Sequence, residues 1–200
     1  AACETPHAAL HFCGHAAYDA ARPLQSCLFL AGESRLTARD LLDRDLSAYS
    51  LVSLAACETG IAGEVALTAD YVGLVSAFLR AGVAAVLSTL WTVESFTTSL
   101  LIVEFYHHLQ TGQPPAAALH AAQTWLREAK AADLHTWAVT AQNHLQAAGR
   151  PEANLFASRA RVFANQLPDS CPYAHPYYWA AFTLSGHTFR TDALNQTSAG

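Results

Sequence analysis

The feature that most constrains the fold is a set of short, continuous apolar runs that alternate with segments of helical spacing. Residues 51–56 (LVSLAA) and 83–87 (VAAVL) are two such runs, and neither shows the polar alternation of a half-exposed strand. Strands that are apolar on both faces are typical of parallel sheets covered by helices on each side. The alternation of runs and helices therefore predicts an α/β layered fold with a mostly parallel sheet.

The same patterns predict the remaining elements. We expect a strand at residues 8–13, a strand or hairpin arm at 27–31, and a last strand, rich in aromatic residues, at 177–184. Apolar spacing, capping residues and glycine or proline boundaries predict helices at about 38–42 after Thr37, 70–80 before Gly82, 94–109 before Gly112, 114–130, 134–148 and 152–166.

The composition is that of a globular protein and excludes several classes of partner. Hydrophobic residues make up 52% of the 200 residues and charged residues 14%, which excludes a disordered chain. The net charge of -5 and the absence of a Lys/Arg cluster argue against nucleic acid. The apolar runs are too short for a membrane span, and the first residues do not resemble a signal peptide. The five cysteines lack the spacing of a disulfide framework, so we expect a cytoplasmic protein without a membrane partner.

Cys57 lies directly after the apolar run 51–56 and is followed by the turn-forming residues Glu58, Thr59 and Gly60. A cysteine at a strand end is most often a small buried hydrophobe. Here the polar turn places the thiol where the chain leaves the core. A nucleophile needs that position, which is partly exposed, rigid and close to free backbone N–H groups.

His15 has the same context, because it follows the run 8–13 and Gly14. The carboxyl ends of parallel strands share one edge of a sheet, and sites form there. If the two strands are neighbours, His15 lies a few ångströms from Cys57. It could then hold or shuttle the thiol proton and protonate a leaving amine.

A metal site is the alternative for the same strand, since His11, Cys13 and His15 alternate and would share one face. No fourth ligand occurs at a usable spacing, so we expect no metal at this position. No glycine-rich phosphate loop appears either, and we expect no cofactor.

Four stretches of the chain form a recognisable set: LHFCGHA (10–16), LVSLAACETG (51–60), FLRAGVAAVLSTLW (78–91) and HPYYWAAFTLSG (175–186). Together they resemble the CHAT family of caspase- and separase-like peptidases, which are commonly joined to tetratricopeptide repeats. The resemblance implies a caspase-like three-layer sandwich, His15 and Cys57 as a catalytic dyad, and hydrolysis of a peptide bond in a protein or peptide substrate. It also implies that the parent chain could carry tetratricopeptide repeats.

The sequence departs from the family pattern in three places. Ala16 stands where the family usually has glycine; its N–H, with that of Cys57, would form the oxyanion hole. After Trp91 the family tends to show an acidic pair, and here only Glu94 is acidic. The family also has two or more strands before the histidine strand. We therefore expect residues 1–190 to be the C-terminal part of a larger peptidase domain lacking its first strands, with a flexible tail at 191–200.

Two functions remain open. The first is a cysteine endopeptidase that acts as a regulated proteolytic effector. The second is a catalytically inactive, caspase-like interaction module, which the departure at Ala16 and the expected lack of the first strands favour. Asp19, Glu58 and Glu94 lie close in sequence to the strand ends, so they are candidate substrate-binding residues that would favour a basic or neutral side chain.

Overall fold

A four-stranded sheet forms the centre of the molecule in the computed structural model, which describes residues 9–17, 19, 21–56 and 72–187. The strand order is β1-β5-β6-β7, with the first three strands parallel and the last antiparallel. The strands are β1 (Ala9–Gly14), β5 (Leu51–Ala56), β6 (Ala85–Thr89) and β7 (Phe182–Gly186). This mostly parallel sheet confirms the sequence prediction.

A second, smaller sheet begins with β2, which follows β1 in the chain after a single residue, His15. It is antiparallel, has the order β2-β3-β4, and consists of β2 (Ala16–Ala17), β3 (Cys27–Phe29) and β4 (Arg35–Thr37). A short 3-10 turn, η1 (Pro23–Gln25), precedes β3. The hairpin arm predicted at 27–31 is therefore present but ends at Phe29, and the sequence patterns missed β2 and β4.

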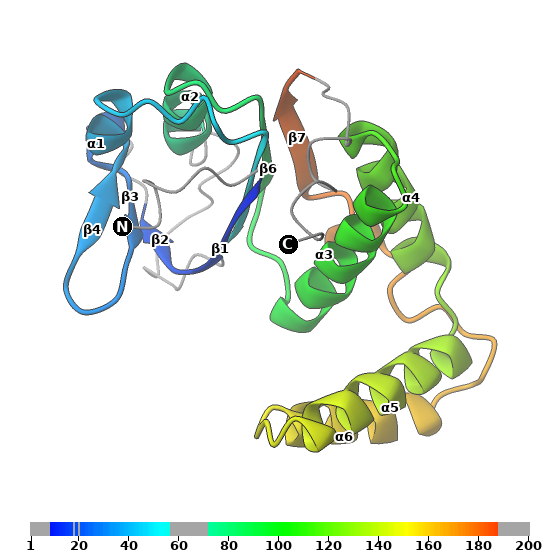
Figure 1. Cartoon of the computed structure of the whole chain (residues 1–200). Coiled ribbons are helices and arrows are strands. Elements are labelled where there is room, and N and C mark those ends of the chain that lie inside the picture. The colour runs from blue at the N-terminus through cyan, green and yellow to red at the C-terminus, as the bar shows by residue number, and fades with distance from the viewer. Residues whose placement is uncertain (1–8, 18, 20, 57–71, 188–200) are drawn as a thin grey trace, which may run out of the picture.

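Helices cover both faces of the central sheet, which gives the three-layer α/β sandwich (Figure 1). On one side lie α1 (Ala38–Leu42) and α2 (Val72–Arg80); on the other lie α3 (Ser95–Gln110) and α4 (Pro115–Glu128). Neighbouring residues of the central strand β6 belong to different cores: Val86 packs with α2, whereas Leu87 packs with α3. Burial on both faces explains why the central strands are continuous apolar runs.

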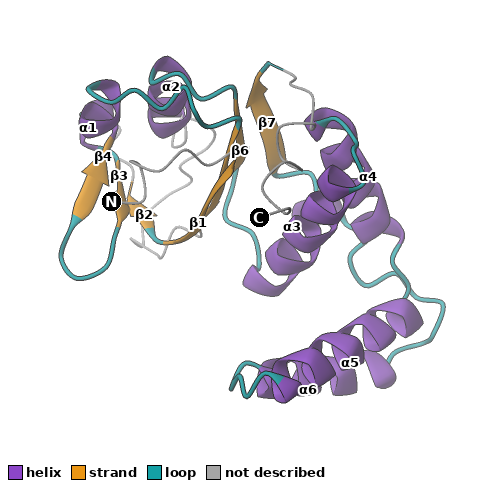
Figure 2. Ribbon diagram, in the orientation of Figure 1, coloured by secondary structure: helices purple, strands orange, loops and turns teal. Residues whose placement is uncertain are grey.

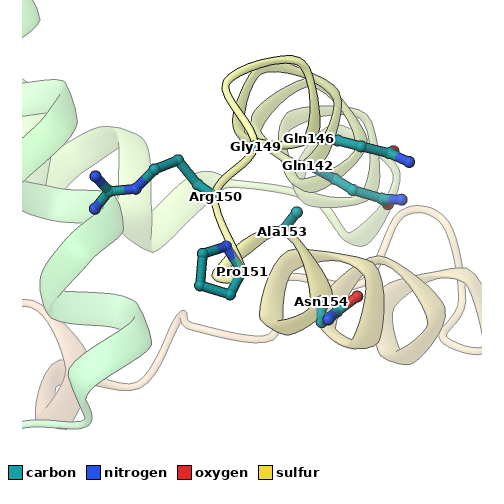
Figure 3. A pocket seen from close by; sticks show the side chains of 7 residues that line it. All are labelled: Gln142, Gln146, Gly149, Arg150, Pro151, Ala153 and Asn154. Carbon is teal, nitrogen blue, oxygen red and sulfur yellow. The ribbon is translucent and has the colours of Figure 1, made fainter.

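The last two helices form a hairpin apart from the sheet. In Figure 2, α5 (Ala131–Ala147) and α6 (Ala153–Ala164) run side by side below the other helices, at the end of the molecule where α3 begins. A small polar cavity of about 310 Å³ lies at the turn of this hairpin (Figure 3). None of the helices in the described ranges has the length and apolar character that a membrane crossing requires.

One strand prediction needs correction. The stretch 177–184 was expected to be one aromatic-rich strand, but its first aromatic residues lie in a 3-10 turn, η2 (Pro176–Tyr178), and β7 begins only at Phe182. The cause is a local polar contact: His175 accepts a hydrogen bond from the N–H of Tyr177 and starts the turn. The Tyr178 ring then packs edge-on against Tyr173 instead of joining the sheet.

Candidate active site

The pairing of β1 with β5 sets the geometry of the strand ends. The two strands are parallel, and their register runs from Ala9 opposite Leu51 to Gly14 opposite Ala56. In the sequence, His15 follows Gly14 and Cys57 follows Ala56. The two strands thus reach the same edge of the sheet in step, one residue before each predicted catalytic residue. Cys57 and the neighbouring Glu58 lie outside the described residues.

His15 lies at the junction of the two sheets and its side chain is exposed. Its backbone carbonyl accepts a hydrogen bond of 2.9 Å from the N–H of Phe29 on β3. The chain is therefore held by the β5 ladder before His15 and by the β3 ladder at and after it. Backbone contacts on both sides fix the position of this residue.

Ala16 follows His15 in β2 and lies opposite Leu28. Because Phe29 donates to the carbonyl of His15, residues 15 and 29 form a hydrogen-bonded pair of the antiparallel ladder. The next pair, Ala16 and Leu28, is then a non-hydrogen-bonded one, so the N–H of Ala16 points away from β3. The strand conformation accommodates a Cβ without strain, which explains how alanine can replace glycine here.

Asp19 lines a cavity of about 460 Å³ beside the chain that leaves His15. Its carboxylate accepts hydrogen bonds from the backbone N–H and the Nε of Arg22, at 2.8 and 3.0 Å. Arg22 and Arg35 line the same cavity. The negative charge of Asp19 is therefore balanced by Arg22, a residue that is not among the predicted site residues.

The Glu94 carboxylate makes two structural contacts at the start of α3. One carboxylate oxygen accepts a hydrogen bond of 3.0 Å from the N–H of Thr97, and the other accepts from the guanidinium of Arg159 on α6. That guanidinium also lies over the ring of Phe96, 4.6 Å from its centroid. Glu94 thus caps one helix and attaches another; a role in substrate binding stays a prediction.

Within the described ranges, no group of three or more His, Cys, Asp or Glu residues has the arrangement to hold a metal ion. Three free cysteines are described: Cys13 and Cys171 are exposed, and Cys27 is buried. These cysteines are useful internal references for the reactivity of Cys57.

A comparison with protein-family models decides the family. The model of the CHAT domain matches residues 1–187. The chain belongs to the CHAT family. This family is caspase-like and peptidase-related, and the three-layer sandwich is the fold expected for it. A search of curated proteins found no match to the chain.

Sequence reasoning missed two parts of this CHAT chain that bear on function. The first is the pair of arginines, Arg22 and Arg35, which line the cavity next to the chain that follows His15. The Asp-x-x-Arg spacing from Asp19 to Arg22 was the available signal, since the short side chain of aspartate often bonds residues that follow it. The second is the α5–α6 hairpin, whose helices were predicted but whose placement was not.

Proposed function

We propose that this CHAT chain is a cysteine endopeptidase in which His15 and Cys57 form the catalytic dyad. The observation that carries the proposal is the parallel register of β1 and β5, which brings the residues before His15 and Cys57 opposite each other. Family membership supports the same chemistry. The substrate would be a protein or peptide.

The reaction would proceed in two steps. The thiolate sulfur of Cys57 attacks the carbonyl carbon, a C–S bond forms, the C–N bond breaks, and His15 gives its proton to the leaving amine. A water molecule then attacks the thioester carbon, His15 takes a proton from that water, the C–S bond breaks, and the acid product leaves with the Cys57 thiolate restored. The N–H groups of Cys57 and Ala16 would stabilise the oxyanion in both steps. The orientation of the Ala16 N–H away from β3 supports this role.

We also propose a substrate pocket with the carboxylates Asp19, Glu58 and Glu94 near the dyad. Acids in this region would favour a basic or neutral side chain before the cleaved bond. The preference would be modest, because Arg22 binds Asp19 and Arg159 binds Glu94. A profile with a substrate library tests this point, and strong preference for aspartate would contradict it.

The decisive experiment for the dyad is labelling with a peptidyl chloromethyl ketone, followed by peptide mapping with mass spectrometry. We expect Cys57 to react much faster than the exposed Cys13 and Cys171, because a neighbouring histidine favours the thiolate.

In His15→Ala, peptide turnover should disappear, while slow alkylation of Cys57 should remain because a free thiol has a pKa of about 8.5. Turnover by His15→Ala at the original rate would make His15 a structural residue.

The same labelling experiment distinguishes the second candidate, a catalytically inactive interaction module. Ala16 in place of the family's usual glycine is the sequence feature behind that candidate, although the strand conformation at Ala16 leaves its N–H pointing away from β3. If Cys57 reacts no faster than Cys13 in the folded protein, the endopeptidase proposal fails and the interaction module becomes the better description. The proposed effector role, the cytoplasmic location and tetratricopeptide repeats on the parent chain need separate tests in the cell.

A further inference from the structure

A second feature of interest is an open groove where three helices meet, far along the sequence from His15. It has a volume of about 500 Å³. We call it the α3–α5 groove and define it by the following lining residues: Glu104 of α3, Trp125 of α4, and Asp133, Trp137, Thr140 and His144 of α5.

The two tryptophans of the groove differ from the other two in the chain. The indole N–H groups of Trp91 and Trp179 donate to the backbone carbonyls of Tyr177 and Ala174. Among the described residues, the indole N–H groups of Trp125 and Trp137 have no such acceptor, although both side chains are half-buried. Two aromatic side chains therefore line the groove, and their indole N–H groups have no hydrogen-bond acceptor among the described residues.

The charge of the groove is negative. The side chain of Glu104 is only 15% exposed, and one of its carboxylate oxygens lies 3.7 Å from the ring Nδ1 of His107. Asp133 lies at the exposed N-terminal turn of α5. The hydroxyl of Thr140, another lining residue, donates to its own helix at the carbonyl of Thr136, so its proton is already engaged.

The cations near the groove do not neutralise it. Lys130 precedes α5 and lies near Asp133, but its ammonium binds Asp169 at 2.8 Å. His107 is 65% exposed and His144 is also exposed, so solvent screens the interaction of either ring with the groove carboxylates. Two carboxylates and two indole rings then meet in one hollow.

We propose that the α3–α5 groove is a docking site for a partner polypeptide that presents an arginine side chain. A guanidinium has only donors and a flat face, so it matches both the carboxylates and the indole rings. The indole N–H groups would meet carbonyl oxygens of the partner's backbone. The polar cavity at the hairpin turn offers a contrast, because the residues that line it include the amides of Gln142, Gln146 and Asn154 and the guanidinium of Arg150 but no carboxylate (Figure 3).

Fluorine NMR of the full chain labelled with fluorotryptophan tests the proposal, because the four tryptophans give four signals. The probe is an acetylated, amidated alanine pentapeptide with one central arginine, and its control has citrulline, which has the same shape without the charge. Single Trp→Phe variants assign the signals. We expect the signals of Trp125 and Trp137 to shift together and saturably at millimolar probe, while those of Trp91 and Trp179 stay in place.

Two variants separate the groove from general electrostatics. Glu104→Gln should weaken binding of the arginine peptide about tenfold, because a desolvated charge-assisted hydrogen bond is lost. Glu152→Gln removes an exposed carboxylate elsewhere on the hairpin and should leave binding unchanged. The absence of a saturable shift, equal binding of the citrulline peptide, or unchanged binding by Glu104→Gln would each overturn the proposal. None of these readouts depends on peptidase activity.

Discussion

The strand-end region around His15 and the α5–α6 hairpin are held in place in different ways. His15 lies between two backbone ladders, one to β5 and one to β3. Side chains at the start of α3 attach the hairpin to the rest of the molecule. There the Phe96 ring contacts Trp137, Phe156 and Phe163, and Glu94 pairs with Arg159.

The difference teaches where sequence changes should have their effect. A ladder depends on backbone N–H and C=O groups, which substitution of a side chain leaves in place. A side-chain attachment depends on a few large groups, and the loss of one leaves a cavity. Side-chain substitutions in the strand-end region should therefore reduce activity while the fold is kept. Side-chain substitutions at the hairpin attachment should instead detach the hairpin from the rest of the molecule.

The largest expected effect is on activity, at the strand ends. Cys57→Ala should abolish peptidase activity and change the free energy of unfolding by at most about 1–2 kcal/mol, because the swap is small. The measurements are a peptide cleavage assay and urea unfolding. Cys13→Ala, at an exposed position of β1, is the matched control and should keep its activity. Full activity in Cys57→Ala would contradict the assignment of Cys57 to the catalytic dyad.

The largest expected effect on stability is at the hairpin attachment. Phe96 is 4% exposed, so Phe96→Ala should cost about 3–5 kcal/mol. Hydrogen exchange should rise more in α5 and α6 than in β6 if the hairpin depends on this ring. Phe29→Ala, at a ring that is 37% exposed, should cost no more than about 1 kcal/mol. An equal rise in all elements would show that the hairpin and the sheet unfold as one unit.

A smaller effect is expected for the ion pair between Glu94 and Arg159. Both side chains are about one third exposed, at 34% and 33%, so solvent screens their attraction. A double-mutant cycle with Glu94→Gln and Arg159→Gln should give a coupling free energy of about 1 kcal/mol. The control cycle on Lys130 and Asp169, a more exposed pair, should give a value near zero. A larger coupling in the control pair would contradict the attachment role.

The smallest effect is a pH dependence at α1, on the sheet side of the molecule. The side-chain hydroxyl and the backbone N–H of Thr37 donate to the Asp40 carboxylate and lower its pKa. The unfolded chain binds this proton more readily, so the stabilisation is present above the ordinary pKa of about 3.9 and is lost as the pH falls through the lower folded value.

Unfolding midpoints across this acidic range measure the effect. Asp40→Asn should flatten the curve slightly, whereas Thr37→Ala should cost about 1 kcal/mol at neutral pH through loss of the N-cap. Asp43→Asn, just after α1, is the control. An unchanged pH profile in Asp40→Asn would show that the cap contributes no measurable linkage.

Much of the fold could be predicted because its signals are local. The apolar run 51–56 matches β5, and the Thr37 capping box starts α1 as expected. Gly82 and Gly112 end α2 and α3 with φ values of +103° and +87°, a region that favours glycine. The strand predicted at 177–184 failed, because a cap at His175 outweighed the β propensity of the aromatic residues.

In the candidate site, too, the features with a local signal could be predicted from the sequence and the contacts between separate elements could not. The sequence by itself determined that His15 and Cys57 each follow an apolar run. A central strand is buried on both faces, so its residues form an uninterrupted apolar run that can be recognised in the sequence. Only the tertiary structure decided that β1 and β5 are neighbours in register, that Arg22 binds Asp19, and that Glu94 meets Arg159 across 65 residues. Such pairings depend on how separate elements pack, and no local pattern encodes the contacts between residues that only the folded chain brings together.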